Sequence, residues 1–281
     1  MLIKRVITAV VLLGILAVDL ALENPWPLLF FFSVAVAVTA FEWLRLTLPG
    51  QTMIASALGL VLGLGTLWQA HVWLEAQYMD LTLLQVAVVL SSVIWLTAIP
   101  AKLLTAKIHH QPKSILWSVF APICLYATWG ALALFWINEG AWSLLSLLLV
   151  IWIADILAYF GGKQFGKNKL APNISPGKTR EGALLGLAGV LIWMLVTAQF
   201  DNSYAFWLQQ AWGWVGLLCG SILLGVLAIM GDLFESYLKR QANVKDSSRL
   251  LPGHGGVYDR VDAVVAVVPV AYLLISDFWF R

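Results

Sequence analysis

Long apolar segments, separated by short polar connections, dominate the chain. A membrane-spanning helix needs roughly 20 mostly apolar residues, and nine segments meet this requirement. Their approximate bounds are 6–22, 27–46, 52–70, 81–99, 115–137, 143–160, 182–200, 211–231 and 261–279. The pattern predicts an all-α polytopic membrane protein with about nine transmembrane helices. Lys4-Arg5 precede the first segment as in a signal peptide, but no clean small-residue cleavage site follows, so a retained helix is expected.

The composition supports a bilayer environment. Of the 281 residues, 61% are hydrophobic and 11% are charged, whereas roughly a quarter are charged in an average soluble domain. A soluble fold could not bury so much apolar surface, so lipid must cover part of it. The net charge is only +2, and no global positive field favours nucleic acid as a partner. We expect one membrane-embedded domain over residues 1–281, with N-terminal helices in 1–137 and the site-bearing part in 138–281.

The basic residues are distributed unevenly among the connections. If the N-terminus is cytoplasmic, 16 of the 17 Lys and Arg residues fall in cytoplasmic connections, and only Arg281 falls outside. Lys and Arg near helix ends are retained in the cytoplasm during membrane insertion. The distribution therefore predicts an N-terminus inside and a C-terminus outside.

Two of the predicted cytoplasmic segments, 161–182 and 231–262, are far more polar than their surroundings. Each follows an apolar segment that contains or ends in a carboxylate, Asp155 in one case and Asp232 in the other. A carboxylate within a spanning segment costs roughly 2.5–3.5 kcal/mol on insertion scales and usually faces a polar cavity with a partner. These two segments are the candidate site.

The second segment combines carboxylates, basic side chains and closely spaced glycines. If its helix continues past residue 231, two carboxylates and a lysine share one face. Glycines allow backbone N–H groups to approach a phosphate, and an arginine suits bidentate phosphate contact. Metal-assisted phosphoryl or nucleotidyl transfer requires this set of groups; a solvated cytoplasmic loop is the alternative interpretation, and the composition favours function over it. The residues concerned are Asp232, Glu235, Ser236, Lys239, Pro252–Gly256, Asp259, Arg260 and Asp262.

The same segment resembles the signature of the phosphatidate cytidylyltransferases, also called CDP-diacylglycerol synthases. The matching positions are Ser236, Lys239-Arg240, Lys245-Asp246, Ser248, Leu251-Pro252, His254-Gly255-Gly256, Asp259-Arg260 and Asp262. The first polar segment is also similar to that family, at Asp155, Tyr159, Ser175-Pro176-Gly177-Lys178-Thr179 and Glu181-Gly182. Arg180 stands where an aromatic residue is expected. In the first half of the chain the resemblance is limited to hydropathy and length, and it assigns no site there.

The resemblance implies that CTP and phosphatidate react to give CDP-diacylglycerol and pyrophosphate. It also implies a magnesium requirement and a homodimeric helical fold in the bacterial inner membrane, with the site facing the cytoplasm. Carried over by position, Asp232 and Asp259 bind the metal ion. Asp246 and His254, which lie within the matching signature, are also expected among the catalytic residues.

We assign the remaining roles from side-chain chemistry. Basic groups would neutralise the oxygens of both substrates, and the glycine backbone with His254 would line the phosphate pocket. The first polar segment would close over the nucleotide. Asp155 would be either a further metal ligand or a residue that orients a metal ligand. The basic groups are Lys239, Arg240, Lys245 and Arg260, the glycines are Gly255 and Gly256, and the closing residues are Ser175 and Lys178.

A phosphate monoester has its second pKa near about 6, so phosphatidate is largely dianionic at neutral pH. It needs no general base, and we expect direct in-line attack on the α-phosphorus of CTP without a covalent enzyme intermediate. A CTP-dependent lipid-alcohol kinase is the alternative within the same chemistry, and it would need a base for its hydroxyl nucleophile. A CDP-alcohol phosphotransferase would show an Asp-Gly-x-x-Ala-Arg motif, which the sequence lacks.

A secondary transporter is the alternative from another class, with Asp19, Glu42 and Asp155 as relay residues. Transporters of this kind often consist of two similar halves. Here no internal repeat is evident, and the polar residues concentrate in the second half. The sequence therefore favours an enzyme.

Overall fold

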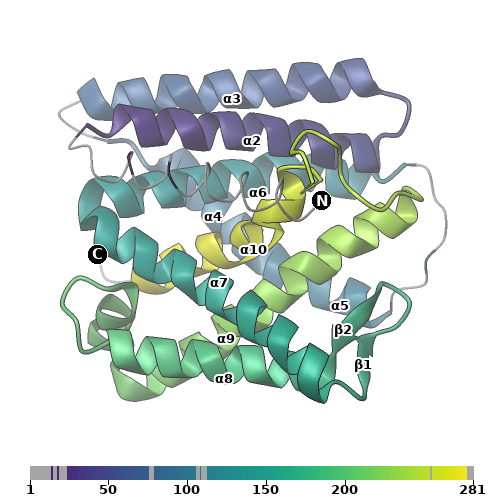
Figure 1. Cartoon of the computed structure of the whole chain (residues 1–281). Coiled ribbons are helices and arrows are strands. Elements are labelled where there is room, and N and C mark those ends of the chain that lie inside the picture. Colours follow the sequence, from purple (N-terminus) through teal and green to yellow (C-terminus); the bar gives the residue numbers. More distant parts are fainter. Residues whose placement is uncertain are drawn as a thin grey trace.

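The computed structural model describes residues 24–75, 79–105, 113–253 and 255–276, with the single positions 14, 18 and 108 (Figure 1). Most of the predicted first segment, 6–22, lies outside the described residues. The elements are α2 (Trp26–Thr47), α3 (Thr52–Glu75), α4 (Thr82–Leu96), α5 (Ala98–Leu104), α6 (Ile115–Leu134), the π-helix η1 (Phe135–Glu139), α7 (Gly140–Phe165), β1 (Lys169–Ala171), β2 (Ser175–Thr179), α8 (Arg180–Thr197), α9 (Tyr204–Gln241) and α10 (Tyr258–Ile275).

Within the described residues, six helical stretches are long and apolar enough to cross a membrane. They are Trp26–Thr47, Thr52–Glu75, Thr82–Leu104, Ile115–Phe165, Arg180–Thr197 and Tyr204–Gln241. The chain is therefore a multi-pass membrane protein, and the total of nine spans stays a prediction. The 51-residue stretch Ile115–Phe165 contains two of the predicted segments and a backbone break at Gly140, where φ is 79°.

The prediction of a wholly helical fold was incomplete, because β1 and β2 form an antiparallel hairpin in the first polar segment. Lys169 pairs with Thr179, and Ala171 pairs with Ser175. Pro176 and Gly177 in β2 are the two residue types least favourable to a helix interior. The segment is also too polar to continue α7 into the bilayer.

Glycines allow neighbouring helices to pack with their backbones in contact. A Cβ on Gly59 or Gly63 of α3 would lie only 2.7 Å from an atom of Ala37 on α2. Gly186 of α8 faces α7 in the same way, where a Cβ would lie 2.7 Å from the carbonyl oxygen of Ala154. Small residues at such contacts are the usual basis of helix association in membranes.

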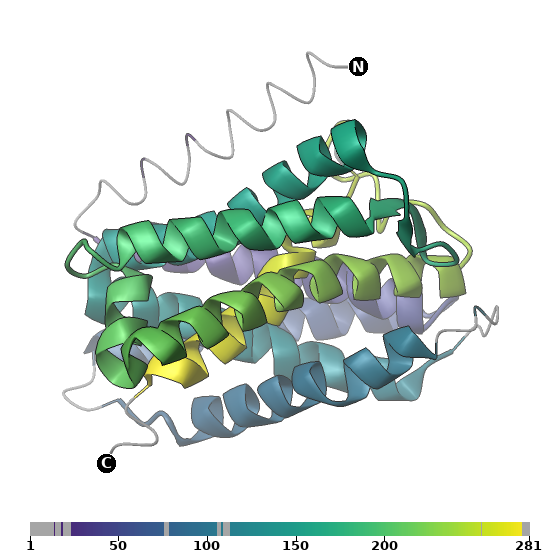
Figure 2. The same ribbon diagram turned by 90° about the horizontal axis from the view of Figure 1, so that it is seen from below.

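Three of the connections predicted to be cytoplasmic lie at one end of the helix bundle. In Figure 1 the turn between α2 and α3, the β-hairpin and the connection between α9 and α10 are all at the right, whereas the α8–α9 connection and the end of α10 are at the left. Figure 2 shows α8 and α9 side by side, with α10 in yellow against α9. Since α9 continues to Gln241, the predicted extension of this helix beyond residue 231 is confirmed.

Candidate active site

The helices α9 and α10 cross in direct backbone contact at Gly231. A Cβ at this position would overlap the carbonyl oxygen of Asp262 and would lie 2.8 Å from Cα of Ala263. Asp232 is the next residue on α9, and Asp262 lies at the contact on α10. The glycine thus brings together two carboxylates that are distant in the sequence.

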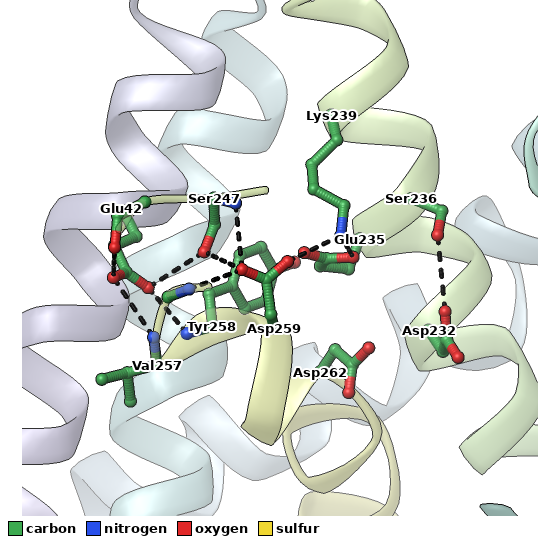
Figure 3. A network of polar contacts seen from close by, with 12 residues as sticks. Glu42, Asp232, Glu235, Ser236, Lys239, Ser247, Val257, Tyr258, Asp259 and Asp262 are labelled. Atoms are coloured by element: carbon green, nitrogen blue, oxygen red, sulfur yellow. Dashed lines mark hydrogen bonds and ion pairs between the residues drawn. The ribbon is translucent and has the colours of Figure 1, made fainter. Parts of the chain in front are cut away.

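Three carboxylates gather at this crossing, those of Asp232, Glu235 and Asp262 (Figure 3). One oxygen of each lies within 4.8 Å of the other two. Glu235 is 1% exposed, and its Oε1 has no hydrogen-bond partner among the described residues. A buried carboxylate oxygen without a donor is costly unless a cation or a proton meets it. The oxygen set fits a hard divalent cation such as magnesium.

Two lysines lie against this carboxylate group. Lys239 Nζ is 2.6 Å from Glu235 Oε2, and Lys178 Nζ, on β2, is 2.5 Å from Asp232 Oδ2. Asp155, on α7, is close enough to interact electrostatically with the charges of Asp232 and Lys178. The structure therefore brings the two polar segments of the sequence to one place.

Asp259 is held by donors on both of its oxygens. Oδ1 is 2.6 Å from Lys239 Nζ. Oδ2 accepts hydrogen bonds from the Gly256 amide (2.7 Å), the Ser247 amide (3.0 Å) and the Ser247 hydroxyl (2.8 Å). The carboxylate group that the described residues form around Asp232 does not include Asp259. Metal binding by Asp259 stays a prediction, and it would require this residue to exchange Lys239 or the loop donors for the ion.

Glu42, on α2, belongs to this region although the sequence did not assign it a role in catalysis. Its side chain is fully buried, and it accepts hydrogen bonds from Ser247, Ser248, Val257 and Tyr258. Figure 3 shows it beside Ser247 and Asp259. The one signal in the sequence is a carboxylate inside the apolar segment 27–46, which by itself is equally typical of a relay residue in a transporter.

The β-hairpin is fastened to the helices on either side. Arg240 Nε, near the end of α9, donates to the carbonyl oxygen of Ile174 at 3.2 Å. Glu181, in the first turn of α8, accepts from the amides of Lys167 (3.1 Å) and Asn168 (3.2 Å). Arg240, predicted to bind phosphate, here also supports the hairpin that carries Lys178 and Ser175.

The other predicted residues lie in or beside the connection between α9 and α10. Lys245, Asp246 and Arg260 are exposed and accessible to a soluble nucleotide. Gly255 has a φ of 82°, a conformation that favours glycine. The Gly256 amide donates to Asp259, so in this conformation it supports the loop, and its place in a phosphate pocket stays a prediction. His254 lies outside the described residues.

The arrangement places oxygen ligands for a cation beside basic side chains from three elements. Lys178 comes from β2, Lys239 from α9 and Arg260 from α10. Such a site can bind a polyphosphate together with a divalent cation, and it can stabilise the charge of a leaving pyrophosphate.

Comparison with known proteins shows similarity over nearly the whole chain. A sequence profile described as the cytidylyltransferase family matches residues 3–278. The phosphatidate cytidylyltransferase of Pseudomonas aeruginosa is 37% identical, over 99% of this chain and 99% of its own length. That of Haemophilus influenzae is 32% identical over 96% of both chains, and that of Helicobacter pylori strain J99 is 35% identical over 93% of this chain and 87% of its own.

Proposed function

Because the chain belongs to the cytidylyltransferase family, we propose that it transfers CMP from CTP to phosphatidate, giving CDP-diacylglycerol and pyrophosphate. The observation that carries the proposal is the group formed by Asp232, Glu235 and Asp262, flanked by Lys178 and Lys239. It combines a cation site with positive charge for phosphates. The relatives that bear this activity in their names match 96–99% of the chain.

The orientation in the membrane is part of the same proposal. The N-terminus lies in the cytoplasm, the chain crosses the bacterial inner membrane nine times, and the site faces cytoplasmic CTP. The basic bias of the connections and their position at one end of the bundle support this orientation (Figure 1). At about 1.5 Å per residue, the 51-residue stretch Ile115–Phe165 is far longer than the roughly 30 Å hydrocarbon core, which favours two crossings within it.

Magnesium is the cation that this site would hold. Asp232, Glu235 and Asp262 are the residues that would bind it, and the unpaired buried oxygen of Glu235 supports this choice. The pair Asp232 and Asp259, implied by the resemblance, is the competing ligand set. When bound, the ion would neutralise charge on the phosphates of CTP.

The chain's own residues bind and orient two polyanions. Lys178 contacts Asp232, and Arg260 is close enough to Asp155 to interact with it electrostatically, so the two basic groups can contact separate phosphate groups, while Lys239 maintains the orientation of Asp259. A phosphatidate oxygen attacks the α-phosphorus of CTP, a new P–O–P bond forms, and the bond from the α-phosphorus to the bridging oxygen breaks to release pyrophosphate. No proton has to be removed from the dianionic nucleophile. Holding the reactants in line supplies much of the rate.

One incubation tests the proposal against its nearest alternative. Purified protein is supplied with CTP, Mg²⁺ and either phosphatidate or diacylglycerol. We expect CDP-diacylglycerol and pyrophosphate from phosphatidate, and no product from diacylglycerol. Formation of CDP and phosphatidate from diacylglycerol would instead identify a lipid-alcohol kinase. The resemblance also implies a homodimer, which chemical cross-linking in native membranes would test.

A further inference from the structure

Glu42 caps the N-terminus of α10 from another helix. Its Oε1 accepts from the Val257 amide (3.2 Å) and its Oε2 from the Tyr258 amide (2.7 Å). The first amides of a helix have no partner within the helix, and a negative charge stabilises that end. No side chain of α10's own N-cap residue supplies a capping hydrogen bond. A residue more than 200 positions away in the sequence performs that role.

Glu42 also holds the loop that precedes α10. Ser248 Oγ donates to Oε1 at 2.5 Å, and Ser247 Oγ lies 3.2 Å from Oε2. The packing is tight, since a Cβ on Gly256 would overlap Ser247 Oγ and lie 2.6 Å from the Glu42 carboxylate. The loop and the first turn of α10 therefore have a common anchor on α2.

A continuous series of contacts leads from this anchor to the carboxylate group (Figure 3). Ser247 Oγ lies between Glu42 and Asp259, and because a hydroxyl has one hydrogen it donates to one carboxylate at a time. The Ser247 amide also donates to Asp259. Asp259 in turn contacts Lys239, which contacts Glu235.

We propose that Glu42 is a positioning residue of the cytidylyltransferase site, which fixes the loop at Ser247 and Ser248 and thereby the orientation of Asp259 and Lys239. The inference rests on the proposed function for its catalytic consequence, whereas the anchoring of the loop can be measured without it. Glu42 itself is fully buried, and its hydrogen-bond partners among the described residues are Ser247, Ser248, Val257 and Tyr258.

A carboxylate is required at this position, and glutamine cannot replace it. Each oxygen of Glu42 receives one backbone N–H, from Val257 or from Tyr258. An amide N–H cannot act as an acceptor. Whichever way a glutamine side chain is turned, its NH₂ group therefore faces a backbone N–H that is left without a partner. A buried donor without a partner is costly.

The test compares Glu42→Gln with Glu42→Asp and with a matched control on the same helix. The control is Thr47→Val, which removes a buried hydrogen bond from Ser118 Oγ to Thr47 Oγ1 (2.8 Å) and does not touch the loop. One measurement is the rate of trypsin cleavage after Arg249 in the full-length protein, with cleavage after Lys169 in the hairpin as an internal reference. Both of these residues are exposed. The other measurement is kcat and KM for CTP.

We expect Glu42→Gln to accelerate cleavage after Arg249 relative to Lys169 and to lower kcat/KM for CTP by about 10- to 100-fold, the usual effect of removing a residue that supports a metal site. Glu42→Asp, which keeps the charge on a shorter side chain, should lie between the wild type and Glu42→Gln in its cleavage rate and in its kcat/KM. Thr47→Val should have the same cleavage rate and the same kcat/KM as the wild type. If Glu42→Gln does not fold, Ser248→Ala is the second variant, and it should show the same pattern with smaller changes.

Three results would overturn the proposal. Unchanged cleavage after Arg249 would show that Glu42 does not anchor the loop. Faster cleavage with unchanged kinetics would show that the anchor does not position the site. Equal losses in Glu42→Gln and Thr47→Val would show a general effect on α2. If the wild-type protein makes no CDP-diacylglycerol, the proposed function fails, and the cleavage measurement still decides the anchoring.

Discussion

Replacing Asp262 with asparagine should remove the response of the protein to magnesium while making the metal-free protein more stable. In the absence of a cation, two carboxylates whose oxygens lie within 4.8 Å of each other would, if both were ionised, repel each other by about 3.5 kcal/mol at an effective dielectric constant near 20, and otherwise one of them must take up a proton. Lys178 and solvent at the partly exposed Asp232 offset part of this repulsion. We expect a net gain of about 1–2 kcal/mol for Asp262→Asn, which is a rise in Tm of a few degrees.

The response to magnesium is the second half of this prediction. A ligand present at about 100 times its Kd stabilises the folded state by about 2.7 kcal/mol. Wild-type Tm should therefore rise when Mg²⁺ replaces a chelator, and the rise should be small or absent in Asp262→Asn. Tryptophan fluorescence during heating measures both effects, since the chain contains 15 Trp residues. The measurement does not depend on enzymatic activity.

Asp259→Asn provides the contrast. Its Oδ2 accepts from three donors, two of them backbone amides, and Oδ1 contacts Lys239. Asparagine cannot satisfy all of them, so the variant should be destabilised by about 1–3 kcal/mol and lose activity. It should nevertheless keep the Mg²⁺-dependent rise in Tm. The opposite pattern, a response lost in Asp259→Asn and kept in Asp262→Asn, would refute our ligand set and establish the pair Asp232 and Asp259.

Three further predictions concern packing, substrate binding and topology. Gly231→Ala should destabilise the protein by about 1–3 kcal/mol and abolish activity, because a Cβ would overlap the α10 backbone. Gly65→Ala has open space around its Cβ and should leave stability and activity close to the wild type. Thermal unfolding and activity of both variants check this. Lys178→Ala should raise KM for CTP about tenfold, the loss of roughly 1.4 kcal/mol of binding, and steady-state kinetics that show an unchanged KM would contradict its role. In a cysteine-free background, a cysteine that replaces Val244 should resist an impermeant thiol reagent in intact cells and react in inverted vesicles. A cysteine that replaces Asp201 should react in intact cells and resist the reagent in inverted vesicles. Labelling of the cysteine at position 244 in intact cells would reverse the proposed orientation.

The apolar helices and the family could both be predicted from local sequence patterns. Whether a segment of about 20 residues partitions into a bilayer depends on its own composition, so the apolar segments 27–46 and 52–70 correspond closely to α2 and α3. The signature in residues 236–262 was visible for a similar reason, since its residue types and gaps lie within one continuous stretch. The shared face of Asp232, Glu235 and Lys239 followed from helical periodicity alone, once α9 continued past residue 231.

Which of these groups meet depends on how the helices pack in three dimensions. The grouping of Asp262, and not Asp259, with Asp232 depends on the crossing of α9 and α10 at Gly231, a contact between helices that no local pattern encodes. The role of Glu42 depends on α2 packing against a loop more than 200 residues later in the chain. A carboxylate in an apolar segment shows that a polar partner must exist, but the identity of that partner is set by the three-dimensional packing of the helices.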